Sequence, residues 1–156
     1  MAEAKAARAS GSDDRPVLEM DRLIAASPER VFNAFLDPET LARWWGPEGH
    51  GAAEVSLDQR EGGRWRTVII SPDGTRYPVS GIYRVIDRPN RLVMSWAWEN
   101  EDGSPGTDTE VELTFTAAGS GTHLKLAHRG LPTPEELASH RDGWSSSLND
   151  LERLFA

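Results

Sequence analysis

Six consecutive segments between residues 52 and 128 alternate apolar with polar side chains, and short links rich in Gly and Pro separate them. A period of two places successive side chains on opposite faces of a β-strand. Links of hairpin length join antiparallel neighbours, because parallel strands need a crossover connection of a dozen or more residues. The pattern therefore predicts six antiparallel strands, over residues 53–57, 65–69, 77–86, 92–98, 111–115 and 122–128.

Two helix-start signals precede this region, and they follow a weakly alternating segment at residues 17–25 that predicts one more strand. Ser27 is followed by Pro28, and Asp37 is followed by Pro38. Ser and Asp are preferred at the N-cap of a helix, and Pro is preferred at its first position. The two signals predict two short helices in succession, the second of which stops at a Gly-Pro pair.

The last part of the chain predicts a single long helix. Thr133 and Glu136 form a capping-box pattern. Apolar and aromatic side chains then recur at steps of three and four residues, as on the buried face of a helix. This stripe consists of Leu137, His140, Trp144, Leu148, Leu151 and Phe155. A helix that continues to the end of the stripe is about 33 Å long, at ~1.5 Å per residue.

Together these elements predict an α+β fold, in which a curved, seven-stranded antiparallel sheet wraps around the long C-terminal helix and two short helices follow the first strand. One face of such a sheet must be covered, and only the C-terminal helix is long enough to cross it. A helix about 10 Å in diameter cannot fill the whole concave face. We therefore expect a gap lined by inward strand residues and capped by the short helices, and this gap is the candidate site.

The length and composition limit the classes of function. A chain of 156 residues fits one domain, which we place at residues 17–156, after a disordered N-terminal tail at residues 1–16. The formal net charge of −8 opposes non-specific binding to nucleic acid and to anionic membranes. The absence of Cys excludes disulfides and thiolate chemistry, and no apolar run is long enough to span a membrane. We expect a soluble, cytoplasmic monomer or homodimer.

The six Trp residues are a dense set for this length, and most of them fall on expected inward faces or beside the expected mouth of the gap. An indole ring has an apolar body and one N–H, so several around a gap can stack on a flat, ring-bearing ligand. The alternative is that these side chains pack the core and fill the gap. The candidate cavity residues are Trp44, Trp65, Tyr83, Met94, Trp96, Trp98, Phe115, His128, His140 and Trp144.

Two of these candidates are histidines, which can hydrogen-bond to the polar end of a ligand or move a proton near neutral pH. The alternative is that the backbone or a carboxylate satisfies each ring. His123 lies five residues before His128, so within a strand the two rings point to opposite faces. We therefore predict no metal site, and we predict no cofactor. The sequence contains no nucleophile elbow, no phosphate-binding loop before a helix and no zinc-protease motif.

An ordered set of motifs between residues 44 and 148 resembles a known family. The set resembles the activator of heat-shock protein 90 ATPase homologue-like family, within the START-like (SRPBCC, helix-grip) superfamily, and the resemblance covers roughly residues 17–156. The motifs are Trp44-Trp45-Gly46-Pro47, Gly62-Gly63-x-Trp65, Gly81-x-Tyr83, the strand from Leu92 to Trp98, Gly121-Thr122-x-Leu124-x-Leu126-x-His128 and His140-x-x-Gly143-Trp144-x-x-x-Leu148.

The resemblance implies a helix-grip fold with a deep hydrophobic cavity, and ligands such as lipids, sterols, polyketides or other small apolar or aromatic molecules. Our first hypothesis is therefore binding of a small hydrophobic ligand without catalysis. The first alternative is an enzyme of the polyketide cyclase/dehydratase kind, because the superfamily includes aromatase/cyclase enzymes. The second alternative is a chaperone-linked role as an interaction partner of heat-shock protein 90, as the family name implies.

Overall fold

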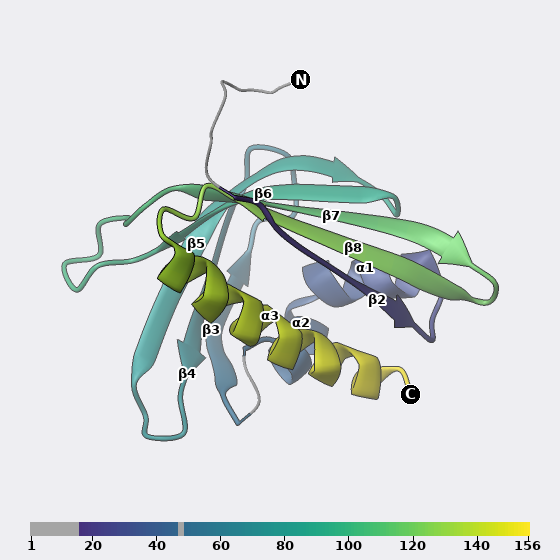
Figure 1. Ribbon diagram of the computed structural model, residues 1–156, viewed down its shortest axis with the longest axis horizontal. Coiled ribbons are helices and arrows are strands. Elements are labelled where there is room, and N and C mark those ends of the chain that lie inside the picture. Colours follow the sequence, from purple (N-terminus) through teal and green to yellow (C-terminus); the bar gives the residue numbers. More distant parts are fainter. Residues whose placement is uncertain (1–15, 47–48) are drawn as a thin grey trace.

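The sheet contains seven strands, all antiparallel, in the spatial order β2-β8-β7-β6-β5-β4-β3 (Figure 1). The computed structural model describes residues 16–46 and 49–156. The six strands predicted from the alternation are consecutive neighbours in the sheet, because hairpin links leave no room for a crossover. The strands are β2 (Leu18–Ile24), β3 (Gly51–Leu57), β4 (Arg64–Ile70), β5 (Arg76–Asp87), β6 (Arg91–Trp98), β7 (Thr109–Ala118) and β8 (Gly121–Arg129).

Three helices lie on one side of the sheet: α1 (Pro28–Leu36), α2 (Pro38–Trp44) and α3 (Pro134–Leu154) (Figure 1). Each begins as the sequence predicts, with a side-chain oxygen at the N-cap that accepts a hydrogen bond from the backbone N–H three residues later, followed by Pro. The N-cap residues are Ser27, Asp37 and Thr133. The α+β helix-grip architecture expected from the sequence is therefore confirmed.

Helix α3 crosses the inner face of the sheet and is fixed by its C-terminal half (Figure 1). Its buried residues are Trp144, Ser147, Leu148 and Leu151, all in the second half of the helix. Arg22 on β2 donates a hydrogen bond to the hydroxyl of Ser145 at 3.1 Å and forms a salt bridge with Glu152 at 2.9 Å. The first half of α3 therefore lies over the sheet without a buried side chain of its own.

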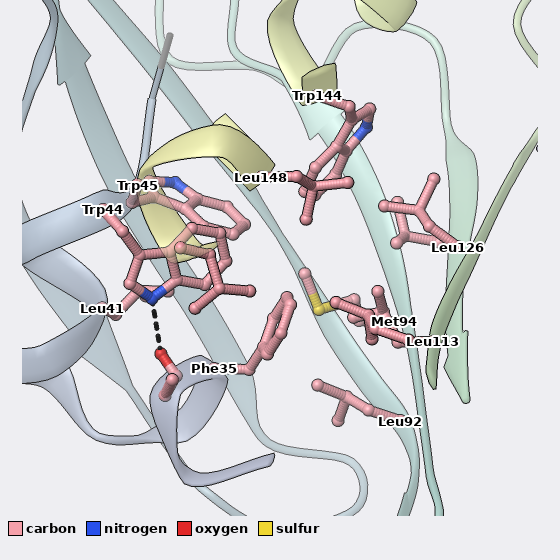
Figure 2. Packing of buried hydrophobic residues seen from close by; sticks show 14 of the residues in the cluster. Phe35, Leu41, Trp44, Trp45, Leu92, Met94, Leu113, Leu126, Trp144 and Leu148 are labelled. Carbon is pink, nitrogen blue, oxygen red and sulfur yellow. Dashed lines mark hydrogen bonds between the residues drawn. The ribbon is translucent and has the colours of Figure 1, made fainter. Parts of the chain in front are cut away.

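Aromatic side chains fill the space beneath α1 and α2. Phe35 meets Trp44 edge-on with ring centroids 4.7 Å apart, and Phe115 on β7 meets both Phe32 and Phe35 at 5.0 and 5.6 Å. The Trp44 indole donates its N–H to the carbonyl of Ala34 at 3.0 Å, as Figure 2 shows. Edge-to-face contacts of this kind are favourable beyond the area that they bury. The aromatic rings therefore interlock in this half of the interior.

Strand β3 departs from the regular alternation that the sequence shows. The pairing with β4 shifts register between Ala53 and Ser56, and Glu54 has a φ of 50°. A β-bulge inserts an extra residue and so reverses which side chains face inward. Ala52 pairs with Ile69 and packs against the core. Ala53 pairs with Val68, and its side chain points to the opposite face of the sheet. The bulge therefore interrupts the strict alternation that the sequence predicts over residues 53–57.

The domain boundaries expected from the sequence stay a prediction. The expected tail, residues 1–16, lies outside the described residues except for Pro16, which is exposed and has no secondary structure. Every helix and strand falls within the expected domain of residues 17–156.

Candidate ligand-binding pocket

A pocket of about 390 Å³ lies under the middle of α3, against strands β4 to β6 and the segment that joins α2 to β3. Two of the four buried residues of α3, Trp144 and Ser147, are among its lining residues. Its size is in the range of pockets that bind small molecules in other proteins. The residues that line it are Trp45, Gly46, His50, Ile69, Tyr77, Trp96, Trp98, Ser139, His140, Gly143, Trp144 and Ser147.

Four indole rings form the apolar walls of the pocket, and Trp96 is at their centre. Its ring centroid lies 5.7 Å from Trp45, 5.6 Å from Trp98 and 5.2 Å from Trp144. Trp65 lies behind Trp96 at 5.5 Å and is not among the lining residues of the described chain. Because the rings support one another, the walls have a defined shape before any ligand enters.

Hydrogen bonds fix most of these rings. Five of the six indole N–H groups donate to a protein acceptor, at distances between 2.9 and 3.1 Å. The acceptors are Ala34 O for Trp44, Thr67 Oγ1 for Trp45, Ser95 O for Trp65, His140 Nε2 for Trp98 and His128 Nδ1 for Trp144. Trp96 is the exception, because its buried Nε1 has no hydrogen-bond partner within residues 16–46 and 49–156.

His140 lines the pocket and is held in one tautomer. Its Nδ1 lies 2.7 Å from the carbonyl oxygen of Glu136, which can only accept, so Nδ1 carries the proton and donates it. The Trp98 indole N–H donates to Nε2 at 2.9 Å, so that nitrogen presents its lone pair. Both ring nitrogens therefore have hydrogen-bond partners within the protein.

His128 lies behind the pocket wall and is held in the opposite tautomer. The Thr109 hydroxyl donates its proton to the carbonyl of Trp96 at 2.7 Å, so it accepts from His128 Nε2–H at 2.8 Å. The Trp144 indole donates to Nδ1 at 3.1 Å. Burial, reinforced by the neighbouring His140, lowers the pKa of His128 to about 3. The ring is thus neutral near pH 7.

This arrangement limits what the pocket can do chemically. A general acid or base needs a proton or a lone pair directed at the substrate. In both His128 and His140 each ring nitrogen already bonds to the protein. The geometry therefore favours holding a ligand over acid–base chemistry at these two rings. Proton transfer by either would first require an indole–imidazole hydrogen bond to break.

The remaining lining groups are apolar side chains or polar ones without a carboxylate, ammonium or guanidinium group in the described chain. Within the described part of the chain, the lining includes no Asp, Glu, Lys or Arg. Ser139 and Ser147 bring hydroxyls from α3, and the half-exposed Tyr77 lies at the mouth. Residues 16–46 and 49–156 also contain no cluster of three or more His, Asp or Glu side chains placed to hold a metal ion.

The structure brings four of the ten residues selected from the sequence to the pocket lining: Trp96, Trp98, His140 and Trp144. The other six are buried elsewhere in the described core and are not among the lining residues. They are Trp44, Trp65, Tyr83, Met94, Phe115 and His128. Tyr83 is 2% exposed, and burial, with a smaller contribution from Asp58, raises the pKa of its hydroxyl. Contact of a ligand with any of the ten stays a prediction.

Sequence reasoning missed several lining residues, and one signal was available for those on α3. Ser139, Gly143 and Ser147 recur every fourth residue and share the face of His140. Small residues on one helix face leave room beside that face. The sequence places Trp45 beside the expected mouth of the gap without selecting it as a cavity residue. Gly46, His50, Ile69 and Tyr77 carried no comparable signal, because they come from separate parts of the chain.

Comparison with known proteins places the chain in a family. Residues 25–156 match the family model described as Activator of Hsp90 ATPase homolog 1-like protein. The chain belongs to this family. The match confirms the resemblance that the ordered motifs indicated, and the helix-grip fold is the one found in this family's solved structures.

Relatives of the family extend this result. A human relative, Activator of 90 kDa heat shock protein ATPase homolog 1, is 28% identical over 118 residues, which are 76% of this chain and 30% of the relative. The chain thus spans less than a third of that relative's length. The crystal structure of an AHSA1 protein from Silicibacter pomeroyi has 32% identity and a TM-score of 0.82, over 89% of this chain and 96% of that one. A Mycobacterium smegmatis protein has 28% identity and a TM-score of 0.77, over 90% of each chain.

Across the described residues, each helix is too short or too polar to traverse a lipid bilayer.

Proposed function

We propose that this protein binds a small, neutral, aromatic or largely apolar molecule in the pocket between α3 and strands β4 to β6. The observation that supports this most strongly is the pocket of about 390 Å³ with four indole rings in its walls. Aromatic walls stack favourably on flat rings. The indole hydrogen bonds preorganise the walls, which reduces the entropy lost when a ligand binds.

The proposal specifies the charge of the ligand as well as its shape. The described lining offers no Lys or Arg to a carboxylate and no Asp or Glu to an amine. A charged group taken from water into such a pocket loses hydration without gaining a partner. The formal net charge of −8 adds a general repulsion of anions. We therefore expect neutral ring compounds to bind and their carboxylates to be rejected.

A thermal-shift titration with two naphthalene derivatives tests this. 2-Acetylnaphthalene is neutral, and 2-naphthoate carries the same rings with a negative charge. A ligand that binds only the folded state at one hundred times its Kd stabilises it by about 2.7 kcal/mol. For a domain of this size that corresponds to a rise in Tm of about 5–10 °C. We expect a saturable rise with the ketone and none with the carboxylate.

Native mass spectrometry of the same mixtures gives the stoichiometry, which should be one ketone per chain. The proposal fails if neither compound binds. It also fails if both bind equally well, because a pocket without charged groups cannot accept the carboxylate at the same affinity.

A second candidate function is an interaction with heat-shock protein 90. It is favoured by membership of the family and by the human relative, whose name is that of an activator of the 90 kDa heat-shock protein ATPase. The chain spans 30% of that relative, so the activity of the whole relative does not transfer with the alignment. Steady-state ATPase assays of purified heat-shock protein 90 with increasing amounts of this protein test the candidate. Saturable stimulation supports it, and an unchanged rate removes it.

A further inference from the structure

One buried hydroxyl lies in the pocket lining without a hydrogen-bond partner within residues 16–46 and 49–156. Seven Ser, Thr and His side chains are buried in these residues, and six of them bond to other protein groups. The six are Thr67, Ser80, Ser95, Thr109, Thr122 and His128. The seventh is Ser147 on α3, which is 5% exposed. Buried polar groups are paired in the great majority of cases, so this exception calls for a physical reason.

The hydroxyl of Ser147 is open to the pocket. Among the side-chain nitrogen and oxygen atoms of the described chain that are sealed from solvent, only Trp96 Nε1 lacks a hydrogen bond. Ser147 Oγ also lacks one within those residues, so it is not sealed. Ser147 lines the pocket, and Trp144 and Leu151, its buried neighbours on the same helix face, close the space on either side along α3. A group that enters the pocket can therefore reach this oxygen.

Ser147 marks the inner end of the pocket along α3. Ser139, Gly143 and Ser147 follow one another at steps of four residues and all line the pocket. Exposure falls along this row, because Ser139 is exposed, Gly143 is half-buried and Ser147 is buried. Between the first and the last of them the helix rises about 12 Å, at ~1.5 Å per residue. A molecule of two fused rings with one substituent has a comparable length.

We propose that the ligand of this pocket carries a neutral hydroxyl group, as in a phenol, at its inner end, and that this group forms a hydrogen bond with the Ser147 hydroxyl. The inference rests on the proposed binding function and adds the chemical class of the ligand and its orientation. The rings then lie beside Gly143, where the helix has no side chain, among Trp45, Trp98 and Trp144.

A hydroxyl complements Ser147 better than other neutral groups do. Ser147 Oγ has one donor and two acceptor sites, and none of them is used within the described residues. An ether oxygen of a ligand could engage only the donor, and a methyl group could engage neither. A phenolic hydroxyl can engage either kind of site, and it is neutral at pH 7 because a phenol has a pKa of about 10. The described lining, which has no Lys or Arg, requires this neutrality.

Two probes of the same shape isolate the contribution of the hydroxyl. 2-Naphthol carries an O–H where 2-methylnaphthalene carries a methyl group. We expect both to bind the unmodified protein. Ser147→Ala should weaken binding of 2-naphthol about fivefold or more and leave that of 2-methylnaphthalene within about twofold, because a neutral hydrogen bond contributes roughly 1 kcal/mol net. Equilibrium dialysis of each probe against each protein measures the dissociation constants.

Ser145→Ala is the matched control. It removes a hydroxyl of the same helix that accepts a hydrogen bond from Arg22 and is not among the lining residues of the described chain. Ala has a higher helix propensity than Ser, so both variants should fold. The ratio of the two dissociation constants should be the same in Ser145→Ala as in the unmodified protein.

The orientation of the bound probe gives a second readout, which a general change in stability would not produce. Protein labelled with ¹³C at serine allows contacts of Ser139 and Ser147 to be detected by NMR, with signals assigned from single Ser→Ala variants. The ring protons beside the hydroxyl of bound 2-naphthol should show nuclear Overhauser effects to the Cβ protons of Ser147. Protons of the other ring should show them to Ser139.

The outcomes distinguish this inference from the function on which it rests. If neither probe binds, the proposed function is overturned, and the inference falls with it. If both bind and Ser147→Ala weakens neither, or weakens both equally, ligand binding stands and this inference is overturned. A bound 2-naphthol whose hydroxyl end lies against Ser139 also overturns it.

Discussion

At the scale of single residues, the pocket wall depends on a glycine outside the pocket lining of the described chain. Gly81 on β5 pairs with Trp65 on β4, and the Trp65 indole lies across it to donate its N–H to Ser95 O at 3.1 Å. A Cβ atom at Gly81 would lie 1.9 Å from Ser95 O and 2.7 Å from Trp65 Nε1. The absence of a side chain therefore allows Trp65 to support Trp96 from behind.

Gly81→Ala should accordingly lower the free energy of unfolding by about 3 kcal/mol, because the clash is with backbone that cannot move aside. Gly51→Ala is the control, since a Cβ at this strand glycine meets no atom within 4 Å. That variant should stay within about 0.5 kcal/mol of the unmodified protein. Urea denaturation measures both. Equal effects of the two substitutions would contradict the role assigned to Gly81.

His128 makes the stability of the protein depend on pH. Its folded-state pKa of about 3 lies below the ordinary value of 6.5, so between these values the unfolded chain takes up a proton that the folded protein does not. Proton uptake by the unfolded state favours unfolding as the pH falls. The contribution of His128 is fully present above about pH 6.5 and is lost progressively as the pH falls from there toward 3.

Between pH 7 and pH 5 this residue should therefore cost the protein about 2 kcal/mol of folding free energy. His128→Gln should show that much less loss over the same interval, even though it is less stable at pH 7. His123→Gln, which removes an exposed histidine paired with Asp21, serves as the control and should keep the loss. Urea denaturation at pH 7 and pH 5 measures the loss of unfolding free energy for each protein. An equal loss in His128→Gln and in the unmodified protein would contradict the prediction.

At the scale of elements, α3 carries a glycine where a helix ordinarily disfavours one. Gly143 lies at the centre of the face formed by Ser139, His140, Trp144 and Ser147, all of which line the pocket. Glycine inside a helix costs about 1 kcal/mol relative to Ala. Gly143 thus lowers the stability of α3 relative to Ala, at a position where a side chain would project into the pocket.

Gly143→Ala should raise the free energy of unfolding by up to about 1 kcal/mol and weaken binding of 2-acetylnaphthalene. Gly143→Leu should abolish the thermal shift, because the isobutyl group occupies the pocket. Ala138→Leu, on the exposed face of the same helix, should leave the shift unchanged. If Gly143→Leu still bound the ketone, the ligand would have to occupy a different place.

The sequence predicted the elements better than the pocket. Hairpin-length links determine which strands are neighbours, so the order of β3 to β8 follows from local information alone. Alternation assigns a side chain to a face of the sheet but does not say what fills the space beyond it. Met94 and Trp96 share an inward face of β6, yet only Trp96 lines the pocket in the described chain. The difference comes from α1, whose phenylalanines fill the space beneath β7.

Bulges are the other limit of an argument from periodicity. One extra residue between Ala53 and Ser56 changes which side chains of β3 face the core. Neither Ala nor Ser is a residue type that marks a bulge in the sequence. The glycine on α3 was the more informative signal. A glycine that lowers the stability of a helix calls for a local reason, and Gly143 lies in the pocket lining.

At the scale of the whole molecule, the interior has two parts with different packing. Beneath α1 and α2 the aromatic rings interlock, whereas beneath the middle of α3 the sheet faces a pocket of about 390 Å³. The last turns of α3 belong to the packed part, through Leu148 and Leu151 and through the salt bridge from Arg22 to Glu152. One helix therefore joins a well-packed region to a hollow one.

This division predicts a gradient of local stability along α3. Segments with few buried contacts open with lower free energy than the global transition. Backbone amides at residues 138–143 should therefore exchange with solvent faster than those at 148–151, where Leu148 and Leu151 are buried. Hydrogen exchange followed by NMR or mass spectrometry measures the gradient in the unmodified protein.

We attribute this gradient of exchange rates to the pocket and not to fraying of the end of the helix, and the two explanations predict different results. Filling the pocket with 2-acetylnaphthalene or by Gly143→Leu should slow exchange at residues 138–143 and leave the slow amides at 148–151 nearly unchanged, because none of the residues 148–151 is among the lining residues. Fraying at the N-terminus of α3 would respond to neither change. If the difference in exchange rates persists when the pocket is filled, the low local stability of the first half of α3 does not depend on the pocket, and the prediction is wrong.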